Sequence, residues 1–467
     1  MNWTKDNSKI SIADLAKVFK YEEKPTTLIT WESGNSEPHA RSLLDSQWQG
    51  WLAHQRHDKP DSEPAVYIIL AKSGLPNTPL PWGPSSNEMT TAPASNAATR
   101  GKRSLRTVPF SQATFRHITE HFCIHGSISA VVNRADVPVF SHAQVRMTDS
   151  TGQMRLAHVY NCRSSNSWEK DLALTITYLP ECRKTYCIMF GCDEVIETEV
   201  QKRLFAVGPD IFFPLVMPGI LAELERVRHM GVVTKALGLM ETKIAELESI
   251  HNLMDEGFAS REAEQRSSSR RTLWLDTAYL RDGLTTWKAQ LERLRYCVAD
   301  LGNSQKQNHN QDETAQSGHS ADDLTCHAKT SQIMANRIEA IEEEYSQAIL
   351  SCSMRLEGMS IATQWAQGET NLSIAIATSH DSKVMRSIAI ITMLFLPGTF
   401  FAGIFSTSFF SWQGSETSGE SGISSFFWIY VLFTLLFTLL TVGLWWYIVI
   451  HRPKQRRNSE EAEYQMT

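Results

Sequence analysis

The sequence has little that would point to nucleic acid or to catalysis. Lys and Arg number 45 against 51 Asp and Glu, so the formal net charge is -6. That balance gives no reason to expect a nucleic-acid partner. No nucleotide-binding loop, metal-hydrolase motif or convincing nucleophile arrangement occurs, and we expect the scattered histidines His117, His121 and His125 to be structural. We therefore predict that the protein is not an enzyme and needs no resident cofactor.

Cysteine is also scarce, with eight residues in the chain. They lie in segments that we place in a reducing compartment, where disulfides are not expected. Cys182, Cys187 and Cys192 are separated by four residues each within an apolar, strand-like stretch. We interpret them as ordinary buried thiols, with a metal cluster as the alternative.

The N-terminus lacks the basic start and apolar core of a signal peptide, so we expect membrane insertion to depend on the C-terminal part of the chain. Two long apolar runs are present there, Ile388 to Phe405 and Phe426 to Ile450. Each is close to the ~20 residues that a helix needs to cross a bilayer. The sequence therefore predicts an integral membrane protein with two spans, 385–409 and 426–450.

Basic residues predict the orientation of the two spans. The loop between them, 410–425, has no Lys or Arg and carries only the acids Glu416 and Glu420. Cationic residues instead stand before the first run and after the second, at Lys383, Arg386, His451, Arg452, Lys454, Arg456 and Arg457. By the positive-inside rule both termini are cytoplasmic, including the tail 451–467, and the loop is external. We expect the plasma membrane, with an organelle membrane as the alternative.

Residues 1–205 are predicted to form a cytosolic α/β domain with a disordered insertion at 76–103, which is rich in Pro, Ser, Asn, Ala and Thr. An amphipathic helix is expected around Thr114 to Cys123. Short apolar stretches bounded by turn residues predict strands at Thr26–Trp31, Ala65–Lys72, Ser127–Asn133, Arg155–Cys162, Leu172–Leu179 and Thr185–Phe190.

Residues 206–384 are predicted to be a helical stalk with a flexible loop at 302–323. Apolar residues recur at three- and four-residue steps over Ile220–Leu247 and again over Met334–Met359, which is typical of helices that pack in a bundle. A further helix is expected over Leu273–Val298. The acids Glu339, Glu342, Glu343 and Glu344 favour a solvated helix face, with a cation site as the alternative.

Proline is absent from Leu324 to Leu396, so one helix can run from the stalk into the first span. Gly358 and Gly368 weaken that helix, and a break there is the alternative. A continuous helix would connect the cytosolic body mechanically to the membrane.

One face of the first span differs from an ordinary lipid-facing surface. Hydroxyl, small and apolar residues share one stripe, formed by Met385, Ile388, Thr392, Leu396, Thr399 and Gly403. Polar groups in membrane helices normally face protein or water, so this stripe favours a pore lining or close packing between helices. The second span has aromatic residues at both ends and only threonines as polar groups at its centre, which indicates an outer, lipid-facing helix.

The segment Phe395-Leu396-Pro397-Gly398-Thr399-Phe400-Phe401-Ala402-Gly403-Ile404-Phe405, with its basic and apolar start from Met385, resembles the first membrane helix of CorA-type divalent metal transporters. It is similar in particular to divergent fungal members, which share FLPGTF and a following FS element. Pro218 to Arg226 also resembles the start of their cytosolic helical region. The resemblance is close over roughly the last 90 residues and loose elsewhere.

This resemblance implies a homopentamer in a lipid bilayer, in which five first helices line one pore and the second helices form an outer ring. Carried over by position, Ser382 and Met385 would stand at the cytosolic mouth. Ile388, Thr392, Leu396 and Thr399 would follow along the pore, with Gly403 on the same stripe. The transported ion would be Mg²⁺, or Zn²⁺, Co²⁺ or Ni²⁺.

The chain departs from the family at the outer mouth, where Ser406, Thr407 and Ser408 replace the Gly-Met-Asn signature. A serine hydroxyl can accept hydrogen bonds from a hydrated cation but has no carbonyl dipole, so altered selectivity is expected. Glu416 and Glu420 could attract cations to the entrance, or belong to a merely solvated loop. A non-conducting scaffold with a regulatory or tethering role is therefore the alternative to a transporter, and an unrelated two-span tether is a weaker third hypothesis.

Overall fold

The structure is a computed structural model, and it describes residues 9–33, 37–55, 64–72, 104–133, 138–148, 152–164, 171–249, 260–311, 320–406 and 427–447. The predicted insertion 76–103, external loop 410–425 and tail 451–467 lie outside these ranges. The chain divides into two units, Met1–Ala362 and Thr363–Thr467. An α/β N-terminal domain, a long helix and a C-terminal apolar helix make up the fold.

A seven-stranded mixed sheet is the centre of the first unit, in the order β3-β2-β4-β9-β8-β7-β6. Only β4 and β9 pair in parallel, and the other neighbours are antiparallel. The strands are β2 (Thr26–Glu32), β3 (His39–Leu43), β4 (Ala65–Lys72), β6 (Val139–Thr148), β7 (Met154–Arg163), β8 (Ala173–Leu179) and β9 (Lys184–Cys192). A separate parallel pair joins β1 (Lys20–Tyr21) to β5 (Thr107–Val108).

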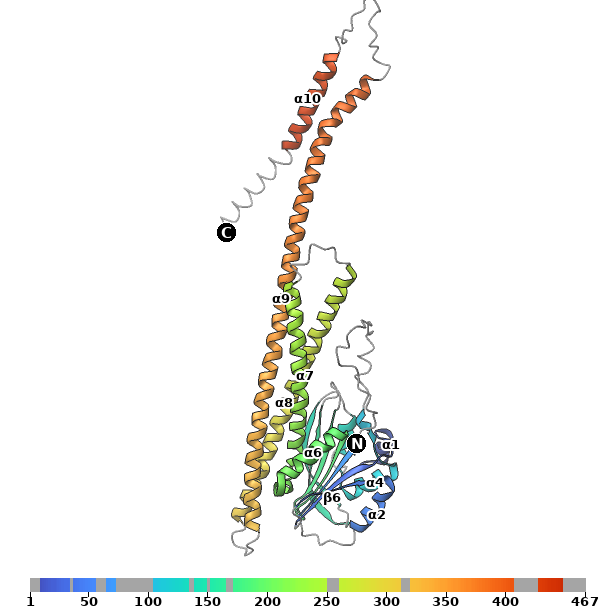
Figure 1. The fold of residues 1–467 in the computed structure, drawn as a ribbon, viewed down its shortest axis with the longest axis vertical. Helices are drawn as coiled ribbons and strands as arrows, with labels where there is room; N and C mark the ends of the chain where they lie inside the picture. Colours follow the sequence, from blue (N-terminus) through green and yellow to red (C-terminus); the bar gives the residue numbers. More distant parts are fainter. Residues whose placement is uncertain are drawn as a thin grey trace, which may run out of the picture. The chain divides into compact units, whose positions relative to one another are not determined.

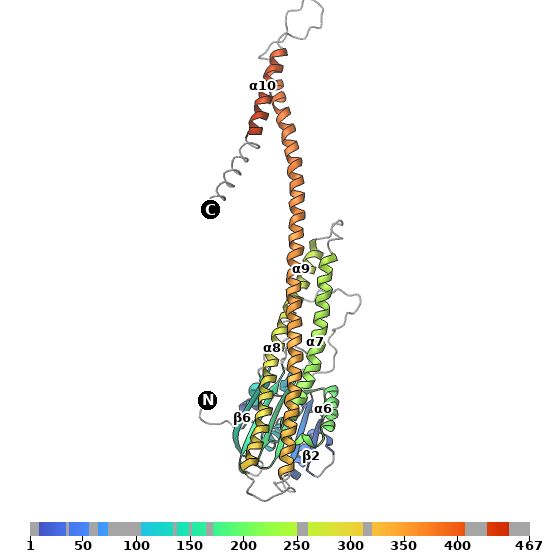
Figure 2. The same cartoon turned by 90° about the vertical axis from the view of Figure 1, so that its left-hand side faces the viewer.

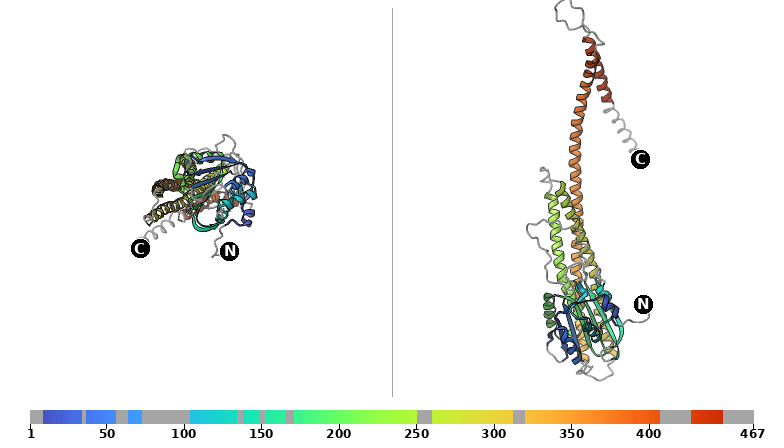
Figure 3. Two further views of the ribbon diagram at one scale, coloured as in Figure 1. Left: turned by 90° about the horizontal axis from the view of Figure 1, so that it is seen from below. Right: turned by 90° about the vertical axis from the view of Figure 1, so that its right-hand side faces the viewer.

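Helices cover both faces of this sheet (Figures 1 and 3). One face packs against α1 (Ile12–Lys17), α2 (Asp45–Gln55), α4 (Gln112–His121) and α5 (Ser127–Asn133). The other face packs against α6 (Glu194–Val207), α7 (Val216–Ser249) and α8 (Ser260–Gln311), with the 3-10 turn η2 (Gly208–Phe212) between α6 and α7. All seven residues of β8 are buried because helices lie above and below it. Its sequence, Ala-Leu-Thr-Ile-Thr-Tyr-Leu, places two buried threonines among apolar residues.

The helical stalk is a bundle of α7, α8 and the first part of α9 (Ser320–Phe405), which run side by side (Figures 1 and 2). Helix α9 is continuous across Gly358 and Gly368 and contains Pro397. The prediction of one uninterrupted helix is therefore confirmed. Apolar side chains spaced by three or four residues, such as Ile338, Ile341 and Tyr345, are buried against the other two helices.

Two element predictions were wrong. Ser127–Asn133 is the helix α5, because its buried Ile128, Val131 and Val132 follow helical spacing and the His125 imidazole accepts from the Ser127 backbone N–H at 3.2 Å. Seven residues are too few for composition to separate strand from helix. The flexible loop predicted at 302–323 is wrong at both ends, where α8 continues to Gln311 and α9 begins at Ser320, and 312–319 lie outside the described residues.

Other element predictions are confirmed. β4 has the predicted limits, β2 extends the predicted Thr26–Trp31 by one residue, and α7 contains the predicted Ile220–Leu247. Within the described residues two helices are long and apolar enough to cross a membrane, in α9 up to Ile404 and in Trp428–Trp446 of α10 (Phe427–Trp446). Of the 18 most apolar consecutive residues in each helix, 6% and 0% are buried. The core helix of a soluble protein would be mostly buried, so these two helices indicate a membrane protein.

Candidate functional site

In the second unit, α10 packs against one face of α9. The Phe401 ring lies 6.2 Å from Phe433 and 5.2 Å from Phe437, between ring centroids. The Tyr430 hydroxyl donates to the Gly398 carbonyl at 3.4 Å, and Pro397 is buried beside them. Aromatic rings and a glycine that permits close approach therefore form the contact between the two apolar helices.

The stripe predicted from the sequence lies on the surface that α10 leaves uncovered. Met385 is 70% exposed, Ile388 59% and Leu396 65%. The other residues of the stripe, Thr392, Thr399 and Gly403, are exposed as well. The same holds for Ser382 and Ser406, the described candidate site residues at its two ends. The stripe therefore does not serve to pack α9 against α10. Its assignment as a pore lining stays a prediction.

Threonine hydroxyls on this stripe bond to the helix itself. Thr392 Oγ1 donates to the Ile388 carbonyl at 2.7 Å, and Thr399 Oγ1 lies 3.2 Å from the Phe395 carbonyl and 3.0 Å from that of Leu396. Each hydroxyl uses its proton in this way and keeps oxygen lone pairs that can accept from water. The uncovered face thus offers acceptor groups between apolar side chains.

The candidate outer mouth is described only at its start. Helix α9 ends at Phe405, and the Ser406 backbone N–H donates to the Ala402 carbonyl at 3.0 Å. Thr407, Ser408, Glu416 and Glu420 lie outside the described residues. Their role in selectivity or cation attraction stays a prediction.

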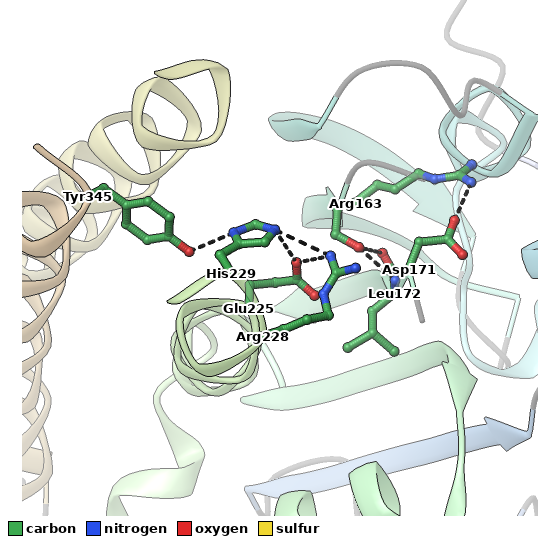
Figure 4. Close-up of polar contacts among 8 residues, drawn as sticks. Arg163, Asp171, Leu172, Glu225, Arg228, His229 and Tyr345 are labelled. Carbon is green, nitrogen blue, oxygen red and sulfur yellow. Dashed lines mark hydrogen bonds and ion pairs between the residues drawn. The ribbon is translucent and has the colours of Figure 1, made fainter. Parts of the chain in front are cut away.

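A buried polar network connects α7 with α9 inside the first unit (Figure 4). The Glu225 carboxylate pairs with Arg228 and lies 3.2 Å from His229 Nε2, all on α7. His229 Nδ1 lies 2.8 Å from the Tyr345 hydroxyl on α9. Arg228 Nη2 also lies 3.4 Å from this Nε2, farther than the carboxylate oxygen. Because a carboxylate only accepts, we assign the imidazole proton to Nε2, and Nδ1 then accepts from Tyr345.

The environment shifts the pKa of Glu225, His229 and Tyr345. Burial alone would raise the pKa of Glu225, but the Arg228 charge and the hydrogen bond from His229 outweigh it and hold that pKa below its usual value. Burial lowers the pKa of His229 despite Glu225, and burial raises the pKa of Tyr345. Near neutral pH the network therefore consists of a carboxylate, a guanidinium, a neutral imidazole and a neutral phenol.

The network has the same order of groups as a catalytic triad, namely carboxylate, imidazole and hydroxyl. A catalytic role is excluded because a substrate cannot reach these buried groups. Tyr345 is 0% exposed and Glu225 is fully buried. No substrate can reach the hydroxyl, so the network fixes α9 against α7. Sequence reasoning missed it, although Glu225, Arg228 and His229 are spaced to share one face of a helix.

Interhelical ion pairs reinforce this contact. The acidic positions 339, 342, 343 and 344 were predicted to be solvated, but Glu342 is buried and accepts from Arg295 on α8 at 3.0 Å. Glu344 pairs with Arg226 on α7 at 3.0 Å. Within the ranges that the structure describes, no three His, Cys, Asp or Glu side chains gather as a metal site.

The three clustered cysteines and the histidines of α4 differ in their burial. Cys182, Cys187 and Cys192 are buried thiols that form no disulfide, and burial raises the pKa of Cys187 and Cys192. His121 is buried among aromatic rings, whereas His117 is exposed on α4. The burial of His121 agrees with a structural role, whereas the role of His117 stays a prediction.

Comparison with known proteins gives little sequence similarity. No protein-family model matches the chain. A segment of 61 residues is 42% identical to the Notoamide biosynthesis cluster protein M' of Aspergillus versicolor, and the match spans 13% of this chain and 13% of that protein.

Two solved structures are similar in outline. The full-length CmaX protein matches with a TM-score of 0.38 and 13% identity, over 91% of this chain and 98% of its own. The CorA magnesium transporter from Methanocaldococcus jannaschii matches with a TM-score of 0.31 and 9% identity, over 89% and 96%. Both similarities are low, and neither assigns a function to this chain.

Proposed function

We propose that the protein is a membrane channel or transporter that conducts divalent cations passively through a pore lined by α9. The observation that carries the proposal is the uncovered stripe of α9, where Thr392 and Thr399 alternate with apolar side chains opposite the face that α10 covers. The free lone pairs of these hydroxyls can accept hydrogen bonds from water along a hydrated path.

The pore requires several copies of the chain, because one helix cannot enclose a path. The resemblance to CorA-type transporters favours a homopentamer with α10 as the outer helix. Met385, Ile388 and Leu396 would form apolar constrictions, and the threonine rings would contact the water shell of the ion. Mg²⁺ gives up its water reluctantly, so a path that binds the hydrated ion suits it, while Zn²⁺, Co²⁺ and Ni²⁺ are the other candidates.

The second candidate is a non-conducting scaffold with a regulatory or tethering role in the membrane. The replacement of Gly-Met-Asn by Ser406, Thr407 and Ser408 favours it, because the residue that would hold a hydrated cation at the outer mouth is absent. The two candidates share the fold, the membrane and the oligomer, and they differ only in ion flux.

Flux measured in liposomes separates the two candidates. The purified full-length chain is reconstituted and uptake of Mg²⁺, Zn²⁺, Co²⁺ and Ni²⁺ is followed in parallel under an inside-negative potential, which favours entry by about 2.3 kcal/mol per charge per 100 mV. Uptake above protein-free vesicles is expected. Absence of flux from a verified oligomer, with no gain in Ser408→Asn, would favour the scaffold, and a monomer in gentle detergent would contradict both.

A further inference from the structure

Two histidines lie together on the sheet of the first unit, on strands β6 and β7. Strands β6 and β7 pair with His142 opposite Tyr160 and His158 opposite Gln144. His142 and His158 are therefore diagonal neighbours on one face. His142 is exposed and His158 is half-buried, so solvent reaches the pair.

The two imidazole rings are nearly parallel, and their nitrogens are close. His142 Nε2 lies 3.2 Å from His158 Nδ1, the ring planes differ by 7° and the ring centroids are 5.4 Å apart. The Tyr160 ring stacks on His142 with centroids 4.6 Å apart. This tyrosine is buried, and it supports the pair from the interior side.

The nitrogen separation suits a shared metal ion. Two nitrogens bound to one tetrahedral Zn²⁺ at ~2.0–2.1 Å are about 3.3 Å apart, close to the distance in the structure. Modest rotation of the exposed rings would turn both lone pairs toward one point. The single proton that now lies between Nε2 and Nδ1 would move to the outer nitrogen of its ring, so binding needs no net loss of a proton.

The surroundings favour the ligand form of both rings. Burial lowers the pKa of both histidines, and His142 lowers that of His158 further, while the charge of Asp300 on α8 opposes the shift. The imidazoles are thus neutral near pH 7, and the nearby carboxylate charge would attract a cation. Within the described residues no third ligand completes a cluster, so water would fill the other positions.

From this geometry we propose that His142 and His158 form a binding site for a borderline transition-metal cation such as Zn²⁺ or Ni²⁺. Imidazole nitrogen suits these ions, whereas Mg²⁺ prefers oxygen ligands. Neither histidine belongs to α9, so the proposal stands or falls independently of conduction through the candidate pore.

The test measures metal binding by the full-length protein in detergent. Zn²⁺ is titrated against a chromogenic chelator for the unchanged protein, for His142→Gln and for His158→Gln, with His117→Gln as the control because His117 is an exposed histidine on α4. We expect each of the first two variants to lose one equivalent, or to bind it at least roughly tenfold more weakly, as removal of one of two ligands requires. The His117→Gln control should keep this equivalent of Zn²⁺, and millimolar Mg²⁺ should not displace the bound Zn²⁺.

X-ray absorption of the Zn²⁺-loaded protein supplies a second readout, with nitrogen neighbours at about 2.0 Å that decrease in number in the variants. Circular dichroism verifies that each variant is folded. Equal Zn²⁺ binding by the unchanged protein and both variants would overturn the proposal, as would efficient displacement by Mg²⁺. In that case the pair is a hydrogen-bonded surface feature only.

Discussion

The imidazole of His229 on α7 and the phenol of Tyr345 on α9 meet at 2.8 Å in the interior of the helical bundle, although 116 residues separate them in the chain. Both side chains are almost completely buried, and the imidazole is held on its other side by the Glu225 carboxylate. A buried polar chain of this kind is costly when one member is removed, because the remaining group loses its partner without gaining water. The part of α9 that belongs to the first unit is thus fixed to α7 at a definite register.

Removal of the Tyr345 hydroxyl should destabilise the first unit. In Tyr345→Phe the His229 Nδ1 acceptor stays buried without its donor, so we expect a loss of about 1–3 kcal/mol in the free energy of unfolding. Chemical denaturation of the full chain, followed by tryptophan fluorescence, measures it. Tyr279→Phe is the matched control on α8, since Tyr279 is 63% exposed and should change stability little. Equal effects of the two substitutions would contradict the role of the network.

Stability should fall as the pH drops through the histidine range. The folded-state pKa of His229 lies below its ordinary value of 6.5, so the unfolded chain binds more protons in this window. The contribution of His229 is complete above about pH 6.5 and is lost as the pH decreases toward the folded-state value. Glu225, whose pKa is also lowered, loses its contribution only at more acidic pH, below about 4.3.

The variant His229→Gln isolates the contribution of this histidine. The unfolding free energy of the unchanged protein and of the variant is compared between about pH 7.5 and about pH 5.5. The variant should be less stable at the upper end, and its stability should depend less on pH. If the unfolding free energy depends equally on pH in both proteins, His229 does not contribute to the pH dependence. His142 and His158, whose pKa values are also lowered, would then account for the whole effect.

Gly191, on β9, should not tolerate a side chain. Its φ is +89°, and a Cβ would lie 2.5 Å from Leu105 Cδ2 and 2.6 Å from the Asp171 carbonyl oxygen. Gly191→Ala should therefore cost the ~1–2 kcal/mol of left-handed backbone plus about 1–3 kcal/mol of overpacking. Gly152→Ala is a matched control, because Gly152 has the same φ but nothing within 4 Å of a Cβ. Unfolding curves that place the two variants at the same midpoint would disprove the close approach.

Substitution within the stripe tests the pore assignment. If Ile388 contributes an apolar constriction, Ile388→Ser should raise basal cation flux in proteoliposomes, because a polar ring is wetted more easily. Ile390→Ser is the control, since Ile390 lies on the same helix two residues later and on a different face. Unchanged or lower flux in a folded, oligomeric Ile388→Ser protein would argue against this stripe as the gate.

Helices and strands with a pattern that repeats along the chain were predicted correctly. The apolar steps of Ile220–Leu247, the buried run of Ala65–Lys72 and the proline-free segment from Leu324 onward each gave the correct element. Each of these patterns repeats over several turns or fills a whole strand, so neighbouring residues reinforce one another. Ser127–Asn133 is short, and there the strand prediction failed because capping by His125 and burial of one helical face decide its conformation.

Side-chain pairs between distant segments could not be predicted. Glu342 was expected in solvent, yet Arg295 on another helix covers and neutralises it. His142 and His158 look unrelated in the sequence, and only the register of β6 against β7 makes them diagonal neighbours. A shift of one residue in that register would place them on opposite faces of the sheet.

The sequence by itself determined the two apolar helices and the stripe of hydroxyl and apolar residues, because composition and period act locally along one helix. It permitted a continuous α9, and the structure decided between continuity and a break. Only the tertiary structure decided that α10 covers the Phe401 face and leaves the stripe open, and that His229 reaches Tyr345. Those contacts depend on which faces of separate helices meet and at what register. Packing of complementary side chains, rather than any local pattern, sets both.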